Sequence, residues 1–290
     1  MPSLLPCDDL RLPELKSLLV QGPFHPTAPI HLALTHTAQN EHYTTLFLSA
    51  AKIENLLKDY NDLQLNSQSG HGITSEVSSR IKMVYPPTPA HLSVLLSLFY
   101  IPSLSDAGSC HPQVTLNAIP SLIILHELSA FFLPQIESEP TSHPWTLASY
   151  LTLVTRTFSM ISRWSKALRE PETTMVLFDS QLDHLKLPIL KFPAAPYERF
   201  RVQEKTARTE DVGLFLRKYF EWIIIAESED LLEPHTGLQE CISKRKRLRI
   251  TQSALSSDEQ TEIWTWIERR FQIPGSELWG TVFIGCERCN

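Results

Sequence analysis

The chain has 290 residues, 42% of them hydrophobic, which is enough to bury one full core. Its formal net charge of -6 excludes a globally basic nucleic-acid binder, although a local basic patch could still supply phosphate contacts. No stretch approaches the roughly 20 uninterrupted apolar residues of a spanning helix, and the N-terminus lacks the basic start and apolar run of a signal peptide, so we expect no membrane association.

The first part of the chain alternates strand and helix signals. Residues 18–20 and 44–49 are short apolar runs typical of buried strands. Between residues 52 and 62 the apolar positions fall on one face of a helix. Residues 80–84 form the next strand candidate, and Thr88-Pro89 then predicts a helix start by a cap followed by a first-turn proline.

Residues 121–125 are the most apolar strand candidate, and an apolar run without polar alternation suits a central parallel strand covered on both faces. A long helix with an apolar seam from Leu147 to Ile161 follows, and residues 174–178 return to a strand. The pattern predicts an α/β fold with a mostly parallel central sheet and helices on both faces. We expect an N-terminal extension (1–17), a core (18–232) and a C-terminal part packed on the core (233–290).

The C-terminal part carries a polar helix-start signal at residues 256–259, and then Trp264, Trp266, Ile267 and Phe271. This pattern predicts an amphipathic helix, followed by a terminal strand at residues 279–284. Because residues two apart diverge on a helix, Trp264 and Trp266 cannot share its buried face. One of the two indoles is therefore expected to meet a partner.

A phosphate loop would place G-x-x-x-x-G-K-[S/T] between the first strand and the first helix. Here the segment begins with Gly22, but Thr27 replaces the second glycine, Ala28 the lysine and Pro29 the magnesium-binding hydroxyl. Its prolines also lack the backbone N–H groups that cradle phosphate. We expect a degenerate loop in which Gly22 makes a turn and the prolines stiffen the backbone, with bound ATP and magnesium as the alternative.

Nucleotide hydrolases of this class also need a carboxylate at the end of a central strand. The strand at residues 121–125 ends in His126, and Glu127 stands one residue further on, where it would point to the opposite face. No catalytic triad signature is present, and the histidines are scattered, with His31 and His36 expected at the surface of the first helix. We predict no catalytic residue and no required cofactor.

Several stretches resemble a known family. The degenerate loop, the strand near residues 46–48, the segment R-I-K-M-V-Y-P-P-T at residues 80–88 and the segment P-S-L-I-I-L-H-E-L at residues 120–128 stand in register with it. Over residues 18–180 the chain resembles the small RecA-like partner of SWIM-domain proteins, the ATPase-like subunit of Shu-type complexes. The resemblance implies a RecA-like core, with His126 where an aspartate is usual.

The same resemblance implies a role and partners. It implies a non-catalytic accessory factor of homologous recombination in the nucleus, acting in a hetero-oligomer with a SWIM-domain protein. The other implied partners are a RecA-type recombinase or its paralogues and single-stranded DNA. A weak or atypical ATPase, and a RecA-like scaffold subunit of an Elongator-type assembly, remain the alternatives.

Two segments are candidates for DNA contacts. The first is a basic run, read as a DNA contact, an import signal or a solvated edge strand, comprising Lys244, Arg245, Lys246, Arg247 and Arg249. In the second, basic residues alternate with aromatic ones, as on surfaces that stack single-stranded bases. Its cations are Lys191, Arg199, Arg201, Lys205 and Arg208.

The five cysteines predict a reducing compartment, because an odd number without framework spacing does not suit a disulfide-stapled fold. Cys286 and Cys289 form a C-x-x-C pair. A structural zinc site needs four ligands, and no second pair stands at finger spacing. We therefore expect no metal site.

Overall fold

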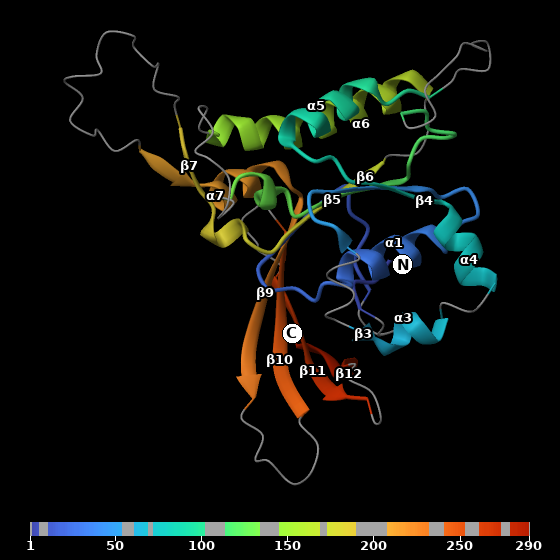
Figure 1. The fold of residues 1–290 in the computed structure, drawn as a ribbon, viewed down its shortest axis with the longest axis vertical. Helices are drawn as coiled ribbons and strands as arrows, with labels where there is room; N and C mark the ends of the chain where they lie inside the picture. The colour runs from blue at the N-terminus through green and yellow to red at the C-terminus, as the bar shows by residue number, and fades with distance from the viewer. Residues whose placement is uncertain are drawn as a thin grey trace.

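The fold is built on one large twisted sheet (Figure 1). The structure is a computed structural model that describes residues 2–5, 11–53, 61–68, 72–101, 114–133, 145–168, 173–189, 208–231, 241–252, 261–273 and 279–289. The strands of the sheet, in chain order, are β1 (Ser17–Gln21), β2 (Thr45–Ser49), β3 (Asn61–Asp62), β4 (Ile81–Val84), β5 (Leu122–His126), β6 (Thr174–Asp179), β9 (Trp222–Leu231), β10 (Cys241–Gln252), β11 (Thr261–Gln272) and β12 (Trp279–Cys289).

The sheet has a parallel half and an antiparallel half. Across it the strands run β4-β2-β5-β6-β1-β9-β10-β11-β12-β3. Every pair from β4 to β9 is parallel, whereas β9 to β12 form an antiparallel meander. A separate small pair joins β7 (Lys186–Pro188) to β8 (Thr209–Asp211). The predicted α/β class with a mostly parallel sheet is confirmed, and β5 lies inside the parallel half as expected.

Helices cover both faces of the parallel half (Figure 1). On one face lie α5 (Pro89–Leu98) and α6 (Leu147–Leu168), and on the other lie α1 (Ala28–Thr37) and α4 (Gly72–Ser79). The described residues also form short helices, which are α3 (Leu63–Gln68), α7 (Val212–Leu216) and the 3-10 turns Leu128–Phe131, Leu182–His184 and Arg217–Tyr219. No helix in these ranges is long and apolar enough to cross a membrane.

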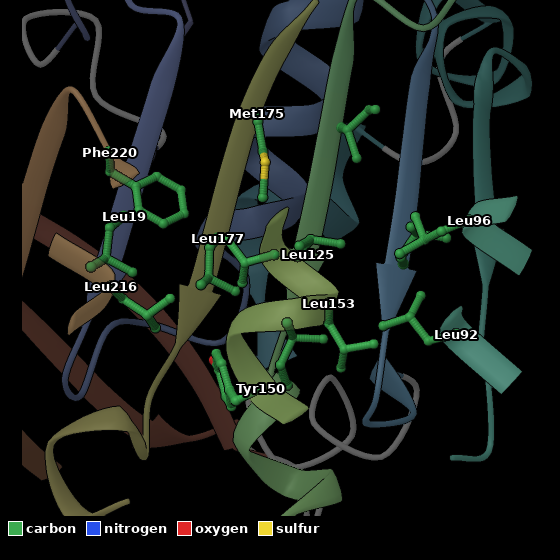
Figure 2. Close-up of a cluster of buried hydrophobic side chains, with 14 of the residues drawn as sticks. Leu19, Leu92, Leu96, Leu125, Tyr150, Leu153, Met175, Leu177, Leu216 and Phe220 are labelled. Carbon is green, nitrogen blue, oxygen red and sulfur yellow. The ribbon is translucent and has the colours of Figure 1, made fainter. Parts of the chain in front are cut away.

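The alternation of side chains along each parallel strand divides the core into two layers. Ile123 and Leu125 of β5 join the layer under α5 and α6, whereas Leu122 and Ile124 join the layer under α1. Figure 2 shows the first layer, with Leu125 and Leu177 of the sheet close to Leu153 of α6. All five residues of β5 are buried, so its apolar sequence follows from cover on both faces.

The predicted start of α5 is confirmed. Thr88 is extended, its hydroxyl accepts a hydrogen bond from the backbone N–H of His91, and Pro89 occupies the first turn. The long helix and the strand at residues 174–178 are also present, as α6 and β6. Of the helix predicted over residues 52–62, residues 54–60 lie outside the described ranges, and Asn61–Asp62 form β3 instead.

The C-terminal helix prediction is wrong. The segment that carries the tryptophans is the strand β11, and residues 256–259 lie outside the described ranges. On a strand, residues two apart share a face, so Trp264 and Trp266 are both buried against the core rather than divided between core and partner. The predicted terminal strand is present within β12.

The two terminal parts are tied to the core. Leu4, Leu5 and Leu12 of the N-terminal extension are buried in the layer under α1. The C-terminal part continues the core sheet by backbone pairing of β10 with β9. Cys286 on β12 is disulfide-bonded, which the cysteine count did not predict.

Candidate functional site

The turn after β1, where a phosphate loop would begin, is shaped by packing against β9. Gly22 has a φ of +86°, a conformation that residues with a Cβ rarely adopt. A Cβ built on Gly22 would lie only 2.4 Å from the carbonyl oxygen of Ala226 on β9. Glycine is therefore required at this position by a close backbone approach within the protein itself.

The phosphate slot contains a network of the chain's own side chains. Thr27 immediately precedes α1, is fully buried, and donates its hydroxyl hydrogen to Asp62 Oδ2 at 2.9 Å. His31 Nε2, one turn along α1, donates to the same oxygen at 2.7 Å. His25 Nδ1 lies 2.7 Å from the Thr27 hydroxyl. The polar groups at the start of α1 thus bind an internal carboxylate.

This network corrects one sequence prediction and adds residues that the sequence did not single out. His31 is buried, not at the surface, and His36 is half-buried, with its Nε2 2.9 Å from Ser121 Oγ. Burial lowers the pKa of His25 to about 3, so its ring is neutral at physiological pH. Asp62 could not be linked to His31 from spacing, because the two residues are 31 positions apart.

The residues in place of the lysine and the magnesium ligand belong to the core. Ala28 and Pro29 are both buried, Ala28 in the layer under α1. Neither side chain offers a polar atom, and a proline backbone has no N–H. The residues present therefore do not fit a magnesium-bound nucleoside triphosphate.

At the end of β5, His126 is buried and neutral. Its Nδ1 lies 2.8 Å from Ser49 Oγ of β2, and its ring packs near Phe24 and Phe47. Burial lowers the pKa of His126 to about 3. This residue serves as a hydrogen-bonding partner between two strand ends.

Glu127 follows the end of β5 and has a left-handed φ of 53°. It lines the same cavity as His126, and its carboxyl group lies near Asp179 and Ser180. The carboxylate accepts hydrogen bonds from the backbone N–H and the hydroxyl of Ser180, at 3.1 and 3.0 Å. Burial and the neighbouring Asp179 raise the pKa of Glu127 to about 8.

Asp179, at the end of β6, is the second buried carboxyl group here. Its oxygens accept hydrogen bonds from the backbone N–H and hydroxyl of Ser129 and from the Tyr150 hydroxyl, the last at 2.6 Å. Burial raises the pKa of Asp179 despite these bonds. An aspartate directly after an apolar strand is a signal that the sequence carried, and it could have been noted alongside His126.

A cavity of about 640 Å³ lies at these strand ends, where α/β proteins usually bind ligands. Its lining includes His126, Glu127 and two lysines. Lys246 Nζ donates to the carbonyl of Pro23 at 2.9 Å and lies 3.9 Å from Glu268 Oε2, while Lys244 pairs with Asp230 at 3.0 Å. Both lysines of the cavity therefore already face acidic groups.

The basic run lies on β10, an interior strand between β9 and β11 and not a sheet edge. Opposite it, β9 carries Glu227, Glu229 and Asp230, which stand in register with three of the five cations and form ion pairs with four of them. Those ion pairs are Arg245–Glu229 at 3.9 Å, Arg247–Glu227 at 3.8 Å, Arg249–Glu227 at 3.0 Å and Lys244–Asp230 at 3.0 Å. The run is thus largely compensated locally, and its binding to DNA stays a prediction.

The second basic candidate falls mostly outside the described residues. Lys191, Arg199, Arg201 and Lys205 are among residues 190–207, which the structure does not describe. Arg208 is described, is exposed, and pairs with Glu210 at 2.6 Å. The prediction for this segment therefore lies outside the described residues, except at Arg208.

The chain is an α/β protein whose first strand lies inside the sheet between two strands from later in the chain, β6 and β9. No family model and no curated protein matches it. Among solved structures, it is similar to the RadB recombinase, with a TM-score of 0.38, 11% identity and 86% of each chain covered. It is also similar to the flagellar accessory protein FlaH from Methanocaldococcus jannaschii, with a TM-score of 0.39 and 9% identity over 91% of this chain and 86% of that one. Both likenesses are weak, so the α/β fold rests on the strand order above, and a RecA-like core stays a prediction.

Proposed function

We propose that this chain is a non-catalytic RecA-like adaptor that acts through partner binding. One observation carries the proposal. Where a phosphate loop would hold nucleotide, the side chains of Thr27 and His31 instead donate hydrogen bonds to Asp62. The apolar residues Ala28 and Pro29 remove the chemistry that hydrolysis needs. An adaptor of this kind uses no ATP and no magnesium.

The more specific role is an accessory factor of homologous recombination. In this role the chain forms a nuclear hetero-oligomer with a SWIM-domain protein and helps a RecA-type recombinase, or its paralogues, assemble on single-stranded DNA. The family resemblance of residues 80–88 and 120–128 supports it. The position of the first segment supports it too. β4 lies at the border of the sheet, and the side chains of Met83 on β4 and of Tyr85 directly after it are exposed.

The ATPase alternative is tested by magnesium-dependent ATP hydrolysis. We expect no turnover above background, because the lysine and the magnesium-binding hydroxyl are absent. The matched control is Glu127→Gln, which preserves the size of the side chain at the cavity. Turnover that disappears in this variant would show an atypical site built on Glu127 and would overturn the adaptor proposal.

The partner is tested by affinity purification of the tagged chain from cells of its source, followed by mass spectrometry. We expect a SWIM-domain protein to co-purify in a stoichiometric complex. The double variant Met83→Asp/Tyr85→Asp places charges on the exposed apolar segment and is expected to release that protein. Co-purification of Elongator-type subunits in its place would favour the scaffold alternative.

A further inference from the structure

One exposed ridge of α6 carries three cations, between residues 156 and 166. Its residues recur at intervals of four and three, which places them in a single row on the helix, and they are Thr152, Arg156, Ser159, Arg163 and Lys166. The opposite face is buried through residues such as Tyr150, Val154 and Trp164. α6 lies with α5 in the helix layer on one face of the sheet (Figure 1), and all five ridge residues are exposed.

Among the described residues of α5 and α6, no acidic side chain compensates the charge of this ridge. The chain has 32 acidic residues, yet α6 and the adjoining α5 contain none. Arg156 donates to the hydroxyl of Ser93 on α5. Within the part of the chain that the structure describes, Arg163 and Lys166 form no ion pair. This layer contrasts with β10, where acids on β9 stand opposite the cations.

The ridge also borders a concavity of suitable chemistry. Phe158, Ser159, Ser162, Arg163 and Lys166 line a shallow space of about 720 Å³. Arginine, lysine and serine hydroxyls are groups that bind phosphate oxygens. Phe158 is half-buried and is held edge-to-face by Phe220, with ring centroids 5.6 Å apart. A fixed aromatic ring beside cations is the combination on which unpaired bases stack.

We propose that the α6 ridge is the surface on which this chain binds single-stranded nucleic acid, with Arg163 and Lys166 on phosphates and Phe158 against a base. The inference rests on the DNA-binding part of the proposed function and transfers that binding from β10 to α6. A duplex does not suit the site as well, because its bases are stacked on each other and not available to Phe158. An acidic peptide would use the cations without the aromatic ring.

The test compares two double variants that remove the same charge. Binding of a fluorescent 20-nucleotide oligodeoxythymidine is followed by anisotropy over a range of salt concentrations. For Arg163→Ala/Lys166→Ala we expect weaker binding and a log-log salt slope flatter by up to about 1.4, at roughly 0.7 for each phosphate that is no longer neutralised. The control, Arg245→Ala/Arg247→Ala, removes two cations that already face acids and should leave the slope unchanged.

A third variant tests the aromatic contact. Phe158→Leu keeps an apolar side chain and every charge, so it should reduce affinity by about fivefold or more with an unchanged salt slope. Its melting temperature is measured beside the wild type, because Phe158 also packs on Phe220. If Phe158→Leu melts early, Ser162→Ala tests the concavity through a hydroxyl contact in its place, and the expected result is weaker binding with an unchanged salt slope.

The outcomes separate the two levels of the proposal. Wild-type binding with a slope that changes in the β10 variant and not in the α6 variant overturns the α6 site and leaves the DNA-binding function intact. No binding by the wild type overturns both. Equal displacement of the oligonucleotide by polyglutamate, together with no effect of Phe158→Leu, assigns the ridge to an acidic protein partner and overturns the nucleic-acid site.

Discussion

Replacing Gly22 by alanine is expected to destabilise the protein by about 3 kcal/mol, because two penalties add at this position. A φ of +86° is costly for a residue with a Cβ, and the added methyl group would meet the Ala226 carbonyl oxygen at 2.4 Å. The obstacle is backbone on β9, so no side-chain rotation can relieve it. Urea unfolding measures the free energy of unfolding, and we expect a lower midpoint at unchanged slope.

The matched control is Gly72→Ala at the start of α4. Apart from the adjacent residues and the backbone of α4 itself, no atom of the described residues lies within 4 Å of the place that the alanine methyl group would take at Gly72. Alanine also has the better helix propensity, so stability should be equal or higher by up to about 1 kcal/mol. If Gly22 served phosphate binding alone, Gly22→Ala would unfold like the wild type. That result would contradict the structural role of Gly22.

The replacement of Asp62 by alanine is expected to cost about 3 kcal/mol. It removes the acceptor for the Thr27 hydroxyl and for His31 Nε2, and both donors are buried. Each buried donor left without a partner costs about 1–3 kcal/mol. Asp230→Ala is the control, since its pair with Lys244 is exposed and should contribute less than about 1 kcal/mol.

The contribution of Asp62 to the free energy of unfolding should decrease in acid. Burial alone would raise the pKa of Asp62, but the hydrogen bond and charge of His31 outweigh it and the pKa is lowered from 3.8. A carboxyl group with a lowered folded-state pKa stabilises the protein fully above its unfolded pKa and loses that effect as pH falls through the folded pKa. The difference in the free energy of unfolding between wild type and Asp62→Ala should therefore become smaller below about pH 4. A difference that grows in acid would contradict the hydrogen bonds of Thr27 and His31 to Asp62.

The parallel half of the fold could be predicted from the sequence because its elements are defined locally. The apolar runs of β2, β5 and β6 are covered on both faces and carry no competing period. The antiparallel half could not be assigned in the same way. In β11 the aromatic and charged residues fit a helical face as well as a strand, and only the pairing with β10 and β12 decides between them.

The sequence showed which phosphate-loop residues are missing, but it did not show that Asp62 binds the polar groups that remain. Substitutions at Thr27, Ala28 and Pro29 are visible in the sequence, whereas the approach of Asp62 depends on where β3 pairs with β12. The acidic partners of the basic run could have been predicted more easily. An acidic segment at residues 227–230 followed across a loop by basic residues predicts a hairpin with opposite charges facing each other.

Thermal stability with and without millimolar magnesium ATP tests the central claim most directly. A ligand that binds only the folded state raises the free energy of unfolding, by about 2.7 kcal/mol when present at 100 times its Kd. Because Thr27 and His31 already donate hydrogen bonds to Asp62, we predict the same melting temperature in buffer, in magnesium alone and in magnesium with ATP. A rise in melting temperature that requires magnesium and ATP together would show a working nucleotide site and contradict the adaptor account.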